Sequence, residues 1–239
     1  MQKLTELELK KNAIAVWYCS FHAHKACLAK YVRLLATDEQ QKANRFKFRK
    51  DKECYIITRG ILRLLLATYL KQRPEEIIFE YTSYGKPFLA NENSLKFNVS
   101  HSGNMAAFVF FYGTEIGVDI EKVKANFNVL ELAQNFFSKK EITALEQQPE
   151  KELPKAFFRC WTRKEAFIKA EGSGLSFPLD KFAVSLDDDI QAELLETQWN
   201  ESEKKEWSLY SFVPANDYIA AVAIAKPNVE IDYKNFDTL

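Results

Sequence analysis

Two acidic residues on one short segment are the first residues of this chain that could do chemistry. Residues 115–121 alternate polar with apolar or glycine side chains, which predicts a strand whose successive side chains point to opposite faces. Asp119 and Glu121 then share one face, while Val118 and Ile120 pack on the other. Two adjacent carboxylates repel each other, and Mg²⁺ is the simplest reason to keep both, because it binds one or two carboxylates together with water and phosphate. A solvated strand edge with two unrelated acids is the alternative.

A third acid stands one helical turn from a lysine further along the chain. Residues 154–171 are predicted to form a long helix, since a proline stands in the first turn and Gly172 follows the last. Trp161, Glu165 and Lys169 are four residues apart and therefore lie on one side of this helix. By spacing alone, Glu165 and Lys169 form a surface salt bridge that contributes a few tenths of a kcal/mol.

The most basic stretch of the chain is residues 42–52, in which phenylalanines are interleaved with lysine and arginine. Two interpretations stay open. The stretch is either a solvated helix face anchored by Phe46 and Phe48, or an anion site in which Arg and Lys contact phosphate. Thr37 and Gln40, in capping-box spacing, are expected to open a helix just before it.

Three histidines complete the set of titratable candidates. His101 follows the short strand predicted for residues 95–99, at a strand end where functional loops are common. By itself, however, such a histidine is more often structural. His22 and His24 are two residues apart without a third ligand of matching type nearby, so we expect histidines of a loop or helix start rather than a metal site.

Length and charge limit the classes of protein that remain. The chain has 239 residues, enough for one large domain or two small ones, and its apolar content of 47% excludes general disorder. Because 33 basic residues balance 33 acidic ones, the net charge is zero. This balance argues against broad nucleic-acid binding and leaves only a local basic patch open. We therefore expect no nucleic-acid partner.

Cysteine usage and the chain start indicate a compartment. Cys19, Cys27, Cys54 and Cys160 are scattered and form no CxxC pair, which indicates free thiols in a reducing environment. The first twelve residues are charged and lack the apolar segment of a signal peptide. No apolar run approaches the ~20 residues that span a bilayer. We expect a cytoplasmic protein with no membrane partner.

Predicted strands and helices come in blocks rather than in strict alternation, which favours an α+β fold. No internal repeat is evident. Strands are expected at residues 13–19, 77–81, 95–99, 105–112, 115–121, 182–186, 207–212 and 218–225. Helices are expected at residues 56–70, 129–137, 138–148 and 154–171. The last three strands should form a mostly antiparallel sheet, and the tail after Pro227 a loose strand or loop.

Five motifs, taken in order and spacing, resemble those of the two-domain 4′-phosphopantetheinyl transferases, the surfactin-synthetase-activating type of that superfamily. The motifs are YGKP at 84–87, FNVSHS at 97–102, GVDIE at 117–121, FFSKKE at 136–141 and WTRKEAFIK at 161–169. The resemblance runs from about residue 42 to about residue 184. Each motif alone is a weak signal, whereas five in the right order are specific.

The resemblance implies a fold and a reaction. The fold would be an α+β pseudo-dimer of two similar α/β subdomains, residues 1–115 for coenzyme A binding and 116–239 for the metal and catalytic residues, with the active site in the cleft between them. The reaction would transfer 4′-phosphopantetheine from coenzyme A to a serine of an apo acyl or peptidyl carrier protein. It would require Mg²⁺ and release adenosine 3′,5′-bisphosphate. A monomer would suffice.

The resemblance also implies roles for individual residues. The Mg²⁺ ligands would be Asp119, Glu121 and Glu165. The catalytic residues would be Asp119 and Glu165, of which Glu165 would deprotonate the serine directly or through a metal-bound water. The residues that bind coenzyme A would be Lys42, Lys86, Ser100, His101 and Lys169.

One departure from the family pattern concerns the 3′-phosphate of coenzyme A. Family members often carry a basic residue three positions before Lys42, where this chain has Glu39. Arg45 or Arg49 could compensate.

Two other functions remain as alternatives. A non-catalytic module that binds carrier proteins or coenzyme A would be expected to lack at least one of the three acids. A different Mg²⁺-dependent phosphoryl or nucleotidyl enzyme would be expected to show a glycine-rich phosphate loop, which the sequence lacks.

Overall fold

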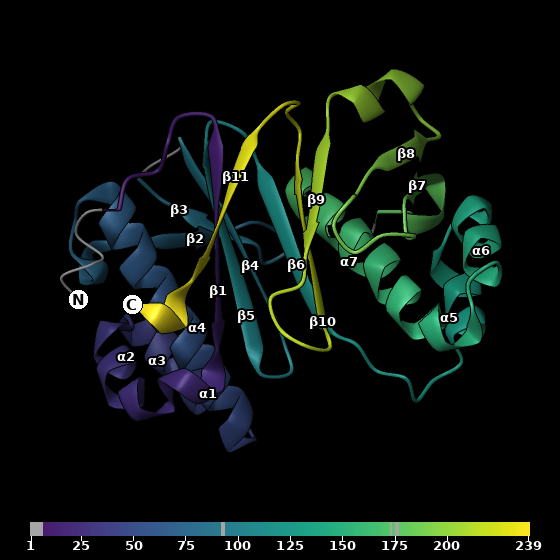
Figure 1. Cartoon of the computed structure of the whole chain (residues 1–239). Helices are drawn as coiled ribbons and strands as arrows, with labels where there is room; N and C mark the ends of the chain where they lie inside the picture. Colours follow the sequence, from purple (N-terminus) through teal and green to yellow (C-terminus); the bar gives the residue numbers. More distant parts are fainter. Residues whose placement is uncertain (1–6, 92–93, 173, 175–176) are drawn as a thin grey trace.

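A computed structural model describes residues 7–91, 94–172, 174 and 177–239, so the start of the charged N-terminus lies outside the described residues (Figure 1). The strands are β1 (Ala13–Ser20), β2 (Phe79–Tyr81), β3 (Pro87–Leu89), β4 (Leu95–Ser102), β5 (Met105–Tyr112), β6 (Ile116–Lys122), β7 (Phe182–Val184), β8 (Leu194–Thr197), β9 (Ser208–Phe212), β10 (Tyr218–Ile224) and β11 (Glu230–Asn235). The α-helices are α1 (Phe21–His24), α2 (Leu28–Leu34), α3 (Thr37–Asn44), α4 (Arg49–Leu70), α5 (Val129–Phe136), α6 (Lys139–Glu146) and α7 (Leu153–Glu171). Short 3₁₀ turns are η1 (Lys25–Cys27), η2 (Pro74–Glu76), η3 (Glu150–Glu152), η5 (Leu179–Lys181), η6 (Glu201–Lys205) and η7 (Phe236–Thr238).

Two separate sheets organise the molecule. The first has the order β11-β1-β5-β4, in which β11 runs parallel to β1 and the other neighbours are antiparallel. The second has the order β6-β10-β9 and is antiparallel throughout. Helices α1–α4 cover the outer side of the first sheet and α7 crosses the outer side of the second (Figure 1).

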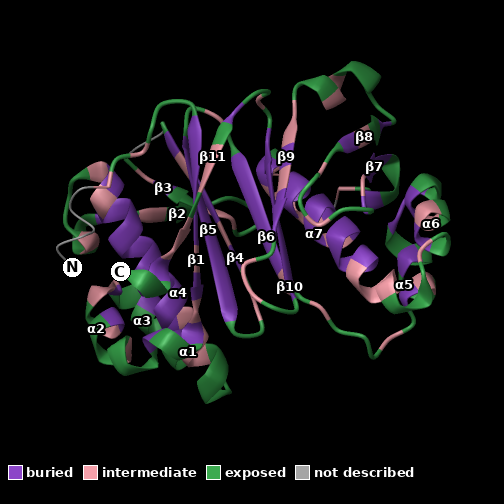
Figure 2. Ribbon diagram, in the orientation of Figure 1, coloured by how far each residue is buried: buried purple, intermediate pink, exposed green. Residues whose placement is uncertain are grey.

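The two sheets face each other across a shared core. Strand β5 is buried on both faces, as its continuous apolar run predicts. Its even-numbered core residues join the cluster under α4, and its odd-numbered residues join a second cluster with residues of β6 and β10. A third cluster lies between α7 and the outer face of the second sheet. Figure 2 shows the buried residues concentrated in β5, β6, β10 and α7. The resulting layers are helix, sheet, sheet and helix, which confirms the α+β pseudo-dimer fold.

The edge strands β4 and β6 meet through side chains and not through a backbone ladder. Asn98 Oδ1 accepts from the Val118 backbone N at 3.0 Å, and Ser102 Oγ accepts from the Lys122 backbone N at 3.2 Å. Between these two bonds, Ser100 Oγ donates to a carboxylate of β6 at 2.8 Å. Every second residue of β4 therefore joins the two sheets, and this seam lies where the sequence places its candidate chemistry.

The capping box expected from Thr37 and Gln40 is wrong by one position. Helix α3 is capped at Ala36, whose backbone N donates to Glu39 Oε2 at 2.8 Å. Glu39 is 2% exposed and also accepts from Arg63 Nε at 2.7 Å, while Arg59 Nε lies 3.3 Å from its other oxygen. The departure from the family pattern therefore has a structural role, because this acid forms ion pairs with two buried arginines.

Three other expectations change in detail. The strand expected at 95–99 continues to Ser102, so Ser100 and His101 lie on β4 rather than in a loop. The basic stretch includes the turn between α3 and α4, and Phe48 is 62% exposed, so it does not anchor a helix face. Strand β7 pairs with β8 in a two-stranded sheet of its own, and the tail after Pro227 forms β11.

Other expectations are confirmed. Helix α6 begins with the predicted capping box, in which Ser138 and Glu141 exchange hydrogen bonds. Helix α7 ends at Gly172, whose φ of 92° only glycine adopts readily. All four cysteines are free. Across the described residues, no helix combines the length and apolarity needed to cross a bilayer.

Candidate active site

A glycine in β6 allows helix α7 to pack closely against the face of the strand that carries the acids. Asp119 and Glu121 alternate with Val118 and Ile120, which are buried in the core between the sheets, so the predicted division of faces is confirmed. Gly117 lies on the acidic face. A Cβ on Gly117 would be 2.1 Å from the Ala166 carbonyl oxygen, so α7 packs directly on the β6 backbone. This close approach brings Glu165 and Lys169 over the acids.

Asp119 is buried and accepts hydrogen bonds from two side chains. It is 3% exposed, and its Oδ1 accepts from Ser100 Oγ at 2.8 Å and from Lys169 Nζ at 2.6 Å. Lys169 Nζ also donates to Ser100 Oγ at 3.1 Å. The second carboxylate oxygen, Oδ2, is buried and has no hydrogen-bond partner among the described residues. One oxygen of Asp119 thus accepts from donors of two elements, β4 and α7, while the other is available.

Glu121 is held in a similar way but is more accessible. Its Oε2 accepts from Ser102 Oγ at 2.6 Å. Burial raises the pKa of the Glu121 carboxyl; the Ser102 hydrogen bond opposes this, and the charge of Asp119 adds to it. Without a cation, the negative charge at this position is therefore disfavoured.

Glu165 reaches the site from α7. Burial raises the pKa of the Glu165 carboxyl; Lys169 opposes this shift, while Asp119 and Glu121 both add to it. Its Oε1 is buried and has no hydrogen-bond partner in the described part of the chain. The mutual effects on pKa show that the three acids are electrostatic neighbours.

The three carboxylates are close but not clustered. Among the described residues, the one set of three His, Cys, Asp or Glu ligand atoms within 4.8 Å of one another lies elsewhere, so these acids are further apart than that. Like charges separate when no cation lies between them. Two buried carboxylate oxygens without partners, Asp119 Oδ2 and Glu165 Oε1, form the oxygen-only donor set that suits Mg²⁺. The residues present therefore fit such an ion.

A cavity of about 570 Å³ opens beside these acids, between the two halves of the chain. It is lined by residues 84–87, Asn98, Val99, Glu165, Ile168, Lys169, Gly172 and Gly174. Lys86 Nζ donates to the Lys169 carbonyl oxygen and to Glu115 Oε2, both at 2.8 Å. This lysine thus joins the β2–β3 turn to the end of α7 and places a positive charge at the cavity wall.

His101 lines a second cavity of about 660 Å³, together with Tyr55 and three lysines, Lys50, Lys122 and Lys124. Desolvation, reinforced by the charge of Lys169, lowers the pKa of His101, so its ring is neutral at pH 7. Lys42 lies near this cavity, with Nζ 5.5 Å from the centre of the Tyr55 ring. The structure therefore groups Ser100, Asp119, Glu165 and Lys169 with Lys86, whereas His101 lines the second cavity and Lys42 lies beside Tyr55, which also lines it.

Comparison with known proteins agrees with this geometry. A model described as the 4′-phosphopantetheinyl transferase superfamily matches residues 115–223, and one described as 4′-phosphopantetheinyl transferase, N-terminal, matches residues 20–110. The 4′-phosphopantetheinyl transferase HetI of a Nostoc species is 34% identical over 94% of this chain and 93% of its own. The chain belongs to the 4′-phosphopantetheinyl transferase superfamily. It is therefore a transferase that phosphopantetheinylates carrier proteins.

Further relatives carry the same activity in their names. The 4′-phosphopantetheinyl transferase Sfp of Bacillus subtilis is 33% identical over 69% of this chain and 72% of its own. The human L-aminoadipate-semialdehyde dehydrogenase-phosphopantetheinyl transferase is 29% identical over 82% of this chain and 69% of its own. This transferase thus shares its family with bacterial and human members.

Two site residues had no role assigned from the sequence. Ser102 fixes Glu121, and Asn98 bonds to the β6 backbone, so both belong to the seam. The period-2 alternation of Asn98, Ser100 and Ser102 was the available signal. It was hidden because the strand was expected to end at Val99.

Proposed function

We propose that this transferase moves the 4′-phosphopantetheine group from coenzyme A to a serine of an apo acyl or peptidyl carrier protein, in a reaction that requires Mg²⁺. The products are the holo carrier and adenosine 3′,5′-bisphosphate. In this proposal residues 1–115 form the subdomain that binds coenzyme A, and residues 116–239 the subdomain that carries the metal ligands. The cavity between the halves supports the assignment.

The observation that carries the proposal is the pair of buried carboxylate oxygens without partners, on Asp119 and Glu165, beside a cavity lined by two lysines. Asp119, Glu121 and Glu165 would hold one Mg²⁺ ion. That ion supplies positive charge to the oxygens of a diphosphate and favours in-line displacement. Without an ion, burial raises the pKa of Glu121 and Glu165, and repulsion from the neighbouring acids adds to both shifts.

The residues of the chain provide the other parts of the reaction. The serine oxygen of the carrier forms a bond to the phosphorus that bears pantetheine, and the bond from that phosphorus to the bridging oxygen of the diphosphate breaks. Glu165 is the proposed acceptor of the serine proton, because it lines the cavity beside the acids of β6. Lys169 and Lys86 neutralise the charge that develops on the departing phosphate.

Coenzyme A would span the two neighbouring cavities. Lys86, Ser100 and Lys169 would contact the diphosphate and nucleotide end, while His101 and Lys42 would contact the 3′-phosphate. A neutral His101 donates one N–H to phosphate without requiring protonation. Lys42 would supply positive charge next to the position where family members often have a basic residue and this chain has Glu39, an acid buried against Arg59 and Arg63.

The carrier protein would dock beside Glu121. An apolar groove of about 470 Å³ lies there and includes Leu132 and Phe136 of α5, each 36% exposed, and Trp161 of α7. Its position next to the acids would deliver the carrier serine to Glu165. Which carrier fits is a question for a panel of apo carriers assayed in parallel.

The test is a mass measurement on an apo carrier incubated with the protein, coenzyme A and Mg²⁺. The carrier should gain the mass of one phosphopantetheine. Asp119→Asn and Glu165→Gln should abolish the gain while the circular dichroism spectrum stays unchanged. Glu230→Gln, at an exposed position of β11, is the matched control and should keep full activity.

Two outcomes would count against the proposal. Near-normal turnover by Asp119→Asn or Glu165→Gln would show that the metal assignment is wrong. Calorimetry that detected coenzyme A binding of equal strength with and without Mg²⁺, together with no mass gain on any carrier, would favour a non-catalytic binding module.

A further inference from the structure

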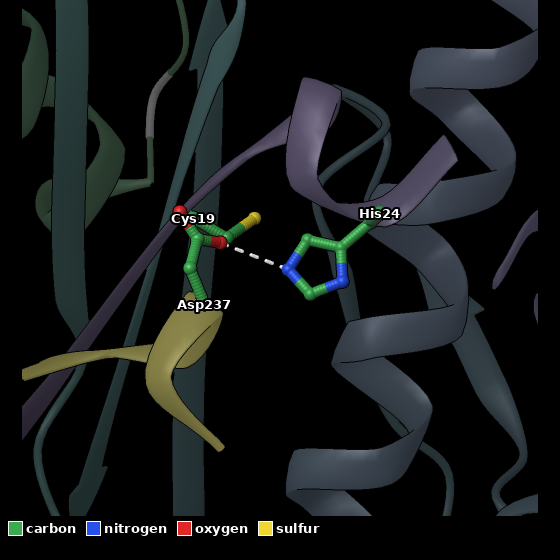
Figure 3. Close-up of side chains that lie close together, drawn as sticks. All are labelled: Cys19, His24 and Asp237. Carbon is green, nitrogen blue, oxygen red and sulfur yellow. Dashed lines mark hydrogen bonds and ion pairs between the residues drawn. The ribbon is translucent and has the colours of Figure 1, made fainter. Parts of the chain in front are cut away.

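A second group of potential metal ligands lies on the outer face of the first sheet, which is also the face of His101, because Cys19 and His101 both pair with Ala106 of β5. Cys19 at the end of β1, His24 at the end of α1 and Asp237 in η7 place Sγ, a ring nitrogen and a carboxylate oxygen within 4.8 Å of one another. Figure 3 shows the three side chains directed toward one another from these three elements. We infer that Cys19, His24 and Asp237 form a zinc site that fastens the C-terminal end of the chain to β1 and α1.

The donor types favour zinc over the ion expected at the carboxylates. Zn²⁺ binds thiolate, imidazole and carboxylate together, whereas Mg²⁺ prefers oxygen alone. Ligand atoms around one tetrahedral zinc lie roughly 3.3–3.8 Å apart, given bonds of 2.0–2.3 Å. The observed grouping within 4.8 Å needs only a small contraction. Three protein ligands leave a fourth position for water on the Asp237 side, where that side chain is 22% exposed.

Neighbouring groups already orient two of the ligands. His24 Nε2 lies 2.9 Å from Asp237 Oδ1, and His24 Nδ1 lies 2.9 Å from the Tyr31 hydroxyl. Asp237 accepts from the Ser20 backbone N with both oxygens at 3.1 Å. A histidine that bonds a second group through its other nitrogen is typical of metal ligands. With zinc bound, His24 would donate Nδ1–H to Tyr31, which frees Nε2 for the metal.

The ligands would also balance the charge of a zinc ion at this position. Cys19 is 0% exposed, and its thiol lies among apolar and aromatic residues of the core under α4. Burial raises the pKa of the thiol, so it stays protonated when no metal is present. Zinc would displace that proton to the buffer, and the dication with one thiolate and one carboxylate would have no net charge. The three ligands come from β1, α1 and η7, so a bound ion would fix the C-terminal end of the chain to β1 and α1.

The test uses the full chain, freed of metal by a chelator and then titrated with Zn²⁺ alone. We expect one zinc per chain by elemental analysis, with release of about one proton per zinc in calorimetry. The melting temperature should rise roughly 5–10 °C at a hundred-fold excess of zinc over its dissociation constant. Co²⁺ in place of zinc should give a thiolate-to-cobalt absorption band.

Variants separate this site from other places where zinc could bind. Cys19→Ser and His24→Gln should lose the zinc and the cobalt band, and Tyr31→Phe should weaken zinc binding roughly 10- to 100-fold. The matched controls Cys27→Ser and His22→Gln replace exposed residues of the same types and should bind zinc as the parent does. Glu165→Gln, at the candidate active site, should also keep the zinc.

Three results would overturn the inference. These are no binding by the parent at micromolar zinc, equal binding by Cys19→Ser and its parent, or loss of zinc in Glu165→Gln alone. If Cys19→Ser fails to fold, the zinc affinity of Asp237→Asn tests the site instead. It keeps an acceptor for Ser20 but loses the charge, so unchanged zinc affinity in that variant would refute the site.

Discussion

Replacing Gly117 by alanine tests whether the contact between α7 and β6 sets the geometry of the site. The added Cβ would lie 2.1 Å from the Ala166 carbonyl oxygen and 2.5 Å from the Ala170 backbone N. Both atoms belong to the backbone of α7, so no side-chain rotation relieves the overlap. To restore an ordinary contact of 3.4 Å, the helix must retreat by about 1.3 Å.

That retreat would carry Glu165 and Lys169 away from the acids of β6. A misplacement of about 1 Å in a catalytic constellation lowers the rate roughly 100-fold. Overpacking costs about 1–3 kcal/mol of stability, which lowers the melting temperature of a domain of this size by about 2–12 °C. We therefore expect kcat/KM for carrier modification to fall at least 100-fold in Gly117→Ala, together with this decrease in the melting temperature.

The control is Gly60→Ala in α4. Its Cβ would lie 2.6 Å from Tyr31 atoms, so the stability should also fall, but far from α7. Activity of the Gly60→Ala enzyme at a temperature where it is folded should match the parent. The reasoning is refuted if Gly117→Ala unfolds at a lower temperature and yet keeps kcat/KM within threefold of the parent, because catalysis would then tolerate a displaced helix.

The remaining predictions concern charge. Ser102→Ala removes the hydrogen bond that lowers the pKa of Glu121, so more of the Glu121 carboxyl should be protonated. The Mg²⁺ concentration for half-maximal activity should therefore rise, and the rise should be larger at pH 6 than at pH 8. An equal rise at both pH values would contradict this reasoning. Burial raises the pKa of the Glu165 carboxyl in the folded protein above its pKa in the unfolded chain. Ionisation of Glu165 therefore destabilises the metal-free fold progressively as the pH rises above the pKa of the unfolded chain. Glu165→Gln should therefore melt higher than the parent in EDTA at pH 7, and the difference should shrink toward pH 4.5; a lower melting temperature at pH 7 would reverse the sign of the argument. Lys164→Met removes the ammonium group that lies 2.7 Å from the buried Glu141 carboxylate, and should lower the free energy of unfolding in urea by about 3–5 kcal/mol. Adding Glu141→Gln to this variant should recover part of the lost stability.

Local patterns predicted the elements that carry the site. The alternation of residues 115–121 has the period of a strand, so it placed Asp119 and Glu121 on one face. Capping residues and a terminal glycine predicted the bounds of α6 and α7 because these signals act within one turn. Whether Asp119, Glu121 and Glu165 bind one ion stays a prediction.

Contacts between distant segments could not be predicted in the same way. Ser100 and Ser102 are polar residues of low strand propensity, and they extend β4 because β5 and β6 flank them. Glu39 meets Arg63 from another helix, so its role depends on tertiary packing. His24 and Asp237 are 213 residues apart in the sequence, and only the parallel pairing of β11 with β1 brings them together.

The side-chain seam between β4 and β6 has a consequence for recombining members of this superfamily. A backbone ladder tolerates almost any side chain, but here the join depends on the identities of Asn98, Ser100 and Ser102. A chimera that takes one half from each of two relatives would misalign the sheets if these three residues did not match the incoming β6, and it would also pair β1 with a β11 from the other parent. Exchanging residues 95–122 as one block keeps both strands from a single parent and preserves their register.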